Sequence, residues 1–292
     1  MNNPEISRAN LYRAILWVFA MLFSFLTMAV AARELSDTIS PFQIVLMRTI
    51  VALSIVSAIV LRSQPGAIAI HRPKLHMFRN FIHYFGNLTW IIGVGLIPLA
   101  QVFALEFTMP IWVAMMAVFF LDEKMTFGKI VAIVLGFIGV LIVLRPGLVP
   151  IELGSLFVLI ASFAFAIAFV SGKSLSKDNA SLAIIFWMFA MQLPISAIGG
   201  IYVWTTPEWA DLPWILWIGV TALTAHYSMV RALALADVTL ILPIDFIRMP
   251  LIAVIGYMFY AEPFSIWIFV GAGLIFAGNY YNIHQEHKGM QK

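Results

Sequence analysis

The strongest constraint on the fold is an internal repeat of two stretches that align without a gap, 139 residues apart. Residues 107–139 fall on residues 246–278, and directly before them Glu106 falls on Asp245. Identical pairs include Phe107/Phe246, Phe120/Phe259, Glu123/Glu262, Val131/Val270, Leu135/Leu274, Phe137/Phe276 and Gly139/Gly278. Such self-similarity predicts a structure built from two related units. We place the boundary between them so that one spans residues 1–147 and the other residues 148–292.

The composition requires a lipid environment. Of the 292 residues, 62% are hydrophobic and only 11% are charged, and a soluble chain of this length cannot bury that much apolar surface. The absence of cysteine excludes disulfides, thiolate metal sites and cysteine nucleophiles. The net charge of +3 does not indicate nucleic acid, because the basic residues lie in short loops between apolar segments. We expect no nucleic-acid partner and no cofactor.

Ten segments have the roughly 20 mostly apolar residues that a membrane helix needs. They are residues 13–31, 42–62, 77–97, 98–120, 125–144, 151–171, 181–203, 213–235, 237–260 and 263–284. Alternation with a period of two residues is absent, which argues against a membrane barrel. We therefore expect an all-α membrane protein with ten transmembrane helices, five in each repeat.

Lysine and arginine are distributed unequally between the two sides of these spans. With the N-terminus in the cytoplasm, only Arg33 and Arg145 fall outside, and Arg48 and Arg248 fall within spans. The inside segments take Arg8, Arg13, Arg62, Arg72, Lys74, Arg79, Lys124, Lys129, Lys173, Lys177, Arg231, Lys288 and Lys292. This asymmetry predicts a cytoplasmic (inner) membrane protein with both termini in the cytoplasm. Because five is an odd number, the second repeat would be inverted relative to the first.

Motifs in both halves resemble the EamA-type repeat of the drug/metabolite transporter superfamily. The first copy has Leu99-Ala100, Pro110, Leu121-Asp122-Glu123-Lys124 and Gly136-Phe137-Ile138-Gly139. The second has Arg231-Ala232-Leu233-Ala234-Leu235-Ala236-Asp237, Pro243, Pro250, Ala261-Glu262-Pro263 and Gly278. The resemblance covers nearly all of residues 10–285. It implies alternating-access transport of small organic solutes, a central cavity among helices 1–4 and 6–9, and helices 5 and 10 at the edge.

One run narrows the resemblance further. Pro243-Ile244-Asp245-Phe246-Ile247-Arg248 is similar to a branch of the superfamily that has members for riboflavin and S-adenosylmethionine. The resemblance does not imply one substrate, since members of the superfamily carry amino acids, nucleoside-like compounds, vitamins and other metabolites.

Glu106 and Asp245 are candidate substrate-binding groups, because a charge deep in a bilayer is costly without a partner or water. Each lies roughly 10–12 Å into its span at 1.5 Å per residue, from opposite faces of the membrane. We therefore expect the two acids on opposite sides of the midplane. Arg248 follows Asp245 by three residues, so a structural ion pair between them is the alternative. Interior prolines in the corresponding stretches, Pro110 in one and Pro243 with Pro250 in the other, predict matched interruptions and favour a site at this depth.

Polar and aromatic residues on two further spans complete the candidate site. Arg79, His83, Asn87 and Trp90 are spaced by four, four and three residues, so they mark one helical face. We expect this face to line a vestibule and a solute pocket. The candidate substrate-binding residues are Glu106, Tyr84, Asn87, Trp90, His226, Tyr227, Arg48 and Asp245. No two histidines have ligand spacing in a buried stretch, so we expect no metal site.

Arg48 lies within the span 42–62 and has no counterpart, since the position 139 residues later is Trp187. Two partners are open for its charge: the carboxylate of Glu106, or a carboxylate of the substrate. Residues that differ between the two repeats are good candidates for recognising a solute, because the solute has no two-fold symmetry of its own.

These features predict a secondary transporter that moves an amino-acid-like, nucleoside-like or vitamin-like metabolite bound near the midplane. The alternatives are a multidrug or metabolite efflux pump driven by proton exchange, a channel, and a polytopic membrane enzyme. An enzyme needs a nucleophile–base pair or metal cluster at one depth, and a channel a selectivity filter; the sequence has neither. Asp122, Glu123 and Glu262 are expected to pair at the membrane surface. Small residues in spans 125–144 and 263–284 indicate close helix packing or a dimer surface, so we expect a monomer or homodimer.

Overall fold

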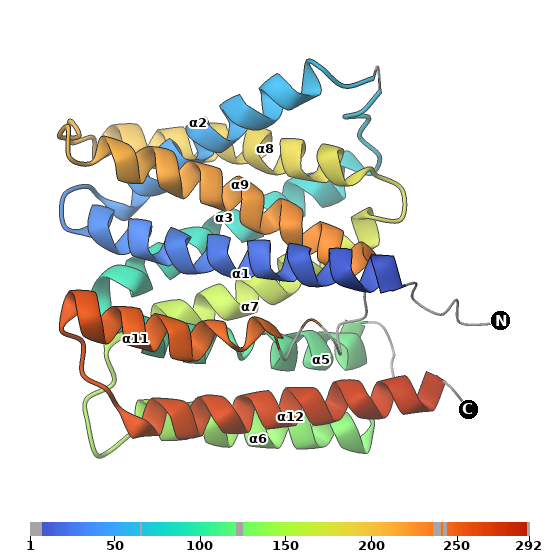
Figure 1. Ribbon diagram of the computed structural model, residues 1–292, viewed down its shortest axis with the longest axis vertical. Coiled ribbons are helices and arrows are strands. Elements are labelled where there is room, and N and C mark those ends of the chain that lie inside the picture. The colour runs from blue at the N-terminus through green and yellow to red at the C-terminus, as the bar shows by residue number, and fades with distance from the viewer. Residues whose placement is uncertain (1–7, 65, 121–124, 236–240, 242–243, 291–292) are drawn as a thin grey trace.

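The computed structural model describes residues 8–64, 66–120, 125–235, 241 and 244–290. Long helices run back and forth along one common direction (Figure 1). They are α1 (Arg8–Ser36), α2 (Pro41–Val60), α3 (Pro73–Leu96), α4 (Leu99–Glu106), α5 (Met109–Phe120), α6 (Phe127–Leu144), α7 (Leu153–Leu175), α8 (Ser181–Tyr202), α9 (Leu212–Leu235), α11 (Arg248–Tyr260) and α12 (Ile266–Met290). This part of the chain is all-α, apart from a single isolated β-bridge between Pro146 and Val149.

Seven helical segments of the described residues are long and apolar enough to cross a membrane. They are Tyr12–Ser36, Pro41–Val60, Leu99–Met116, Phe127–Leu144, Leu153–Leu175, Ser181–Tyr202 and Ile266–Gln285. The helix α3 is long enough but carries the polar face expected from the sequence, and α11 has only 13 residues. The fold is therefore that of a multi-pass membrane protein.

Capping residues set several helix ends. At the start of α2, the Ser40 hydroxyl accepts a hydrogen bond from the backbone N–H of Gln43. Thr126 does the same for α6 through the N–H of Lys129. Both caps satisfy an N–H that has no partner inside the helix. The predicted start of the last span at Pro263 is wrong, because the chain is not helical from residue 261 to 265 and α12 begins three residues later.

Both spans that carry a candidate acid are interrupted directly after it. In the first half α4 ends at Glu106, and a two-residue turn separates it from α5. In the second half Asp245 is the last helical residue before a two-residue turn, and α11 begins after that turn. Each of the spans 98–120 and 237–260 is thus interrupted directly after its acid, as the interior prolines predict.

Prolines account for the position of the two breaks. Pro110 has no N–H, so it cannot donate to the backbone carbonyl of Glu106, which instead lies 3.5 Å from the hydroxyl of Ser162. Pro250 leaves the carbonyl of Phe246 without its usual helical partner in the same way. Irregular backbone at membrane depth is tolerated only where protein or a water-filled cavity surrounds it. The two turn residues of the first break, Phe107 and Thr108, are buried, whereas Ile247 in the second break is 42% exposed.

The helix boundaries recur at the offset found in the sequence. Shifted by 139 residues, α3 (Pro73–Leu96) coincides with α9 (Leu212–Leu235), and the turn after Glu106 coincides with the turn after Asp245. The most extensive helix pairs are α6 with α12, α1 with α9, α3 with α7 and α2 with α8. Each of these pairs joins a helix from residues 1–147 to a helix from residues 148–292.

The pair α6 and α12 lies at one edge of the bundle, where the family resemblance places the fifth and tenth helices (Figure 1). Gly139 and Gly271 let the two backbones touch. A Cβ atom on Gly139 would lie 2.6 Å from the carbonyl oxygen of Gly271, and one on Gly271 would lie 2.5 Å from that of Gly139. Of the two roles that the sequence left open for these glycines, close packing within the chain is the one observed.

We expect Gly271→Ala to lower the melting temperature of the purified protein in detergent. The new methyl group would meet backbone atoms that cannot move aside, and overpacking of this kind costs about 1–3 kcal/mol. Gly273→Ala on the same helix is the matched control, because a Cβ atom there meets nothing within 4 Å. Equal melting temperatures for the two variants would show that the α6–α12 contact is looser than described.

Candidate substrate-binding site

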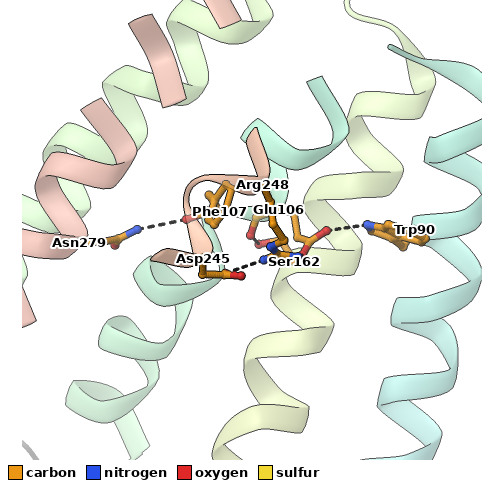
Figure 2. Close-up of polar contacts among 7 residues, drawn as sticks. All are labelled: Trp90, Glu106, Phe107, Ser162, Asp245, Arg248 and Asn279. Carbon is orange, nitrogen blue, oxygen red and sulfur yellow. Dashed lines mark hydrogen bonds and ion pairs between the residues drawn. The ribbon is translucent and has the colours of Figure 1, made fainter. Parts of the chain in front are cut away.

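Glu106, Asp245 and Arg248 meet where the two helix breaks face one another (Figure 2). Nη2 of Arg248 donates to Oδ2 of Asp245 at 2.6 Å, and Nη1 lies 3.5 Å from Oε1 of Glu106. The other carboxylate oxygen of Glu106 accepts a hydrogen bond of 2.7 Å from the indole Nε1 of Trp90 on α3. We call these four residues the acid cluster. It joins side chains from both halves of the chain.

The expectation that the two acids lie on opposite sides of the midplane stays a prediction, and the structure adds that one guanidinium contacts both of them. The hydrocarbon core is about 30 Å thick, so an acid about 12 Å deep lies only about 3 Å from the midplane. Arg248 is long enough to bridge what remains. Counting along straight helices predicts similar depths for Glu106 and Asp245, but it does not predict that one guanidinium contacts both.

The guanidinium of Arg248 is held in an aromatic setting. Its central carbon lies 4.9 Å from the ring centroid of Phe25, 5.4 Å from that of Phe103 and 5.3 Å from that of Phe107. These rings come from the first half of the chain, and their faces attract a cation. Two carboxylates and one guanidinium give the acid cluster a formal charge of −1. The second oxygen of Asp245, Oδ1, is buried and has no hydrogen-bond partner in the described structure.

A second polar group lies further along the same face of α3. Nη1 of Arg48 donates to Oδ1 of Asn87, and the amide of Asn87 lies 3.0 Å from Nδ1 of His83. Gln192 on α8 reaches the same imidazole nitrogen at 2.9 Å, and Asn80 accepts a hydrogen bond of 2.8 Å from Nη1 of Arg79. We call this set the arginine cluster: Arg48, Arg79, Asn80, His83, Asn87 and Gln192. The sequence left Glu106 or a substrate carboxylate as the partner of Arg48. In the structure Arg48 contacts Asn87 and not Glu106.

The remaining candidates lie around these clusters. The ring of His226 is 5.1 Å from that of His83, which places it beside the arginine cluster. Tyr227 packs edge-on against Trp17 at 5.6 Å, and the buried Tyr84 packs against its neighbour Phe85. The structure therefore brings six of the eight candidates into or beside two adjoining polar clusters. Tyr84 and Tyr227 make no hydrogen bond to either cluster within the described ranges.

Comparison with known proteins decides the family. A model of the EamA-like transporter family matches residues 12–145 and matches again at residues 152–283. The chain belongs to the EamA-like transporter family. As an EamA protein it is a membrane transporter and not an enzyme.

Similar proteins with names are also transporters. An S-adenosylmethionine uptake transporter of Rickettsia bellii is 21% identical over 276 residues, covering 94% of this EamA chain and 95% of its own length. Riboflavin transporters of Rhizobium johnstonii and Brucella anthropi are 26% and 27% identical, covering 78% and 81% of this chain and 76% and 86% of their own. A protein of known crystal structure aligns with a TM-score of 0.66 at 15% identity, over 92% of this chain and 95% of that one, and so shares the fold.

Two polar residues that contact the clusters of this EamA protein were not predicted from the sequence. Gln192 is fully buried and bridges His83 and the backbone of Asn80. Ser162 bonds to Thr108 at 2.7 Å beside the first helix break. A signal was present for Gln192, since a single amide in the otherwise apolar span 181–203 is costly in lipid unless it faces a partner.

Glu262 has a structural role in the EamA fold. It lies beside the first residue of α4, whereas the acid cluster lies at the last residue of that helix. Its Oε1 pairs with Nη2 of Arg33 at 2.8 Å, and its Oε2 accepts the backbone N–H of Leu99 at 2.8 Å. Burial raises the pKa of the Glu262 carboxyl, while the Leu99 N–H and Arg33 act in the opposite direction. This carboxylate fastens the loop before α12 to the start of α4. Asp122 and Glu123, expected to act similarly, lie outside the described residues.

Proposed function

We propose that this chain carries a small organic metabolite across the cytoplasmic membrane by alternating access, with the acid cluster at the contact between two inverted five-helix repeats. The observation that carries the proposal is the bridge made by Arg248, which holds Glu106 of one half and Asp245 of the other at matched helix breaks. Secondary transporters bind their solutes near the midplane at interrupted helices between repeats.

The acid cluster has the properties of a contact that can open. Of its two ion pairs one is short, at 2.6 Å, and the other is long, at 3.5 Å, and one oxygen of Asp245 has no hydrogen-bond partner among the described residues. A solute with a cationic group can therefore compete with Arg248 for a carboxylate. Such competition would couple binding to a rearrangement of the two halves, because a ligand shifts a conformational equilibrium only through different contacts in the two states.

The repeats proposed are residues 1–147 and 148–292, the second inverted relative to the first. The recurrence of helix boundaries and of the two breaks supports this division. The first turn of α1 and the last turn of α12 lie at the same end of the bundle (Figure 1), which fits an even number of crossings. The excess of lysine and arginine in the inside segments places that end in the cytoplasm. We propose a monomer or a homodimer.

The proposed substrate-binding residues are Glu106, Tyr84, Asn87, Trp90, His226, Tyr227, Arg48 and Asp245, with Asp245 and Arg248 also forming a structural ion pair. The solute is an amino-acid-like, nucleoside-like or vitamin-like metabolite. S-adenosylmethionine and riboflavin, which appear in the names of relatives, are the first two to test.

Counterflow into proteoliposomes tests the proposal. We expect radiolabelled substrate outside to enter faster when the vesicles hold unlabelled substrate, and the rate to saturate with concentration, because a carrier returns more quickly when loaded. S-adenosylmethionine and riboflavin are run in parallel, with protein-free vesicles as the control. A flux that stays linear in concentration and ignores the internal solute would indicate a channel and contradict alternating access.

A further inference from the structure

The arginine cluster carries positive charge that no carboxylate of the described residues balances by an ion pair. Arg48 is 1% exposed and Arg79 is 8% exposed, and both lie within long helices of the bundle. Their hydrogen-bond partners are amides: Asn87 for Arg48 and Asn80 for Arg79. Among the side chains that the structure describes, no carboxylate forms an ion pair with either guanidinium.

An unbalanced buried guanidinium is expensive in a membrane protein. A charge taken out of water needs an opposite charge or several hydrogen bonds to be tolerated, and arginine cannot lose its proton to escape this cost. Arg248, which is also buried, shows the usual solution, with two carboxylates on one guanidinium. Arg48 and Arg79 differ from it, which indicates that their counter-charge comes from outside the chain.

The free edge of Arg48 has the geometry that recognises a carboxylate. Nη1 is occupied by Asn87, whereas Nε and Nη2 are buried and have no partner within the described structure. Nε and Nη2 lie on the same side of the planar guanidinium, and together they can donate two parallel hydrogen bonds to one carboxylate. Nε of Arg79 and Nδ1 of His226, in and beside the arginine cluster, are also buried without a partner among the described residues.

The two clusters are held by residues less than one helical turn apart on α3. Asn87 and Trp90 stand three residues apart on one face of α3, which is about 4.5 Å along the helix axis. Asn87 holds Arg48, and Trp90 holds Glu106. Positive and negative groups of the protein thus follow one another along a single face. An α-amino acid likewise carries a carboxylate and a cationic group close together in one small molecule.

We propose that the arginine cluster is a carboxylate subsite, in which the Nε and Nη2 edge of Arg48 binds the substrate's α-carboxylate while Glu106 and Asp245 face its cationic group. This inference rests on the proposed transport function and narrows it to zwitterionic amino-carboxylates. It also separates the two candidate solutes. S-adenosylmethionine has a carboxylate, an ammonium and a sulfonium, whereas riboflavin has no carboxylate and is uncharged at neutral pH.

Equilibrium binding to the purified full-length chain in nanodiscs tests the subsite, with S-adenosylmethionine, its decarboxylated analogue and riboflavin as probes. We expect the decarboxylated analogue to bind about 100-fold more weakly than S-adenosylmethionine, because it leaves the buried Arg48 edge unpaired. Riboflavin is expected to bind no better than the analogue. Equal affinity for the two adenosyl compounds, preference for riboflavin, or no binding of S-adenosylmethionine would each overturn the subsite.

Substitution at Arg48 identifies the residue that makes the discrimination. We expect Arg48→Gln to bring the affinities for S-adenosylmethionine and its decarboxylated analogue close together, and Arg48→Lys to retain part of the difference. Arg62→Gln is the matched control, since Arg62 is exposed just beyond the same helix. A merely structural role would weaken both ligands equally and leave their ratio unchanged. If Arg48→Gln does not fold, the affinity ratio of the two adenosyl compounds is measured on Arg79→Gln and on the unsubstituted protein. That ratio still tests whether the arginine cluster binds a carboxylate.

The binding test of the subsite and the counterflow test of transport can fail independently of each other. Nanodiscs have no second compartment, so the comparison of probes requires no translocation. Retained preference for the carboxylate without counterflow would reject the proposed function and keep the subsite. Counterflow that accepts the decarboxylated analogue as readily as S-adenosylmethionine would reject the subsite and keep the proposed function.

Discussion

Glu106→Gln is expected to lower the initial rate of counterflow by about 10- to 100-fold, the effect of losing a charge-assisted hydrogen bond of about 1.5–3 kcal/mol. The amide can still accept the hydrogen bond from Trp90, so the local packing is preserved. It cannot attract Arg248 or a cationic solute, and those are the contacts that would exchange during the transport cycle.

The exposed Glu152, just before α7, provides the matched control, because Glu152→Gln makes the same chemical change far from the clusters. Both variants should elute as one sharp peak in size-exclusion chromatography and melt within a few degrees of the parent. Transport at the parental rate by Glu106→Gln would remove this carboxylate from the mechanism. Loss of transport in Glu152→Gln as well would indicate a general sensitivity of the preparation.

Arg248→Ala is expected to be the most destabilising single substitution in the acid cluster. Removing one partner of a buried ion pair costs about 3–5 kcal/mol, and here two carboxylates lose their partner at once. Asp245→Asn should cost less, because Arg248 keeps Glu106. The double variant should lose less stability than the sum of the two single variants, since the second change removes a charge that the first left unpaired.

Urea or detergent unfolding of the three variants measures this interaction energy. A second cycle with Glu106→Gln and Arg248→Ala divides the contribution of Arg248 between its two acids, and the shorter 2.6 Å contact predicts the larger coupling for Asp245. Strict additivity in the first cycle would mean that Asp245 and Arg248 do not depend on each other in the folded protein.

The helical content and the position of the interruptions follow from patterns that a sequence carries locally. Apolar runs define most helices, and Pro110 and Pro250 mark where two of them break. The polar face of α3 was also legible, because its residues recur at helical spacing. These features depend on neighbours within a few turns, so the chain's own order is enough to predict them.

Contacts between distant segments were less accessible. The pairing of Arg33 with Glu262 joins residues on α1 and in the loop before α12, and nothing local to either residue indicates the other. The bridge from Arg248 to Glu106 was missed because depth along a straight helix does not say which side chains reach across. The choice of Asn87 as the partner of Arg48 depends on how α2 and α3 are rotated, which a sequence pattern does not specify.

The alternation of early and late helices in the packing has a consequence for biosynthesis. While residues 1–147 are inserted alone, α1, α2, α3 and α6 lack the neighbours that they have in the finished protein. The buried side of α3, with Arg79 and Asn80, would then face lipid or the insertion machinery until α7 and α8 emerge from the ribosome. The nascent chain must therefore remain sheltered through most of its synthesis, and a prematurely terminated product would be an early target for membrane proteases.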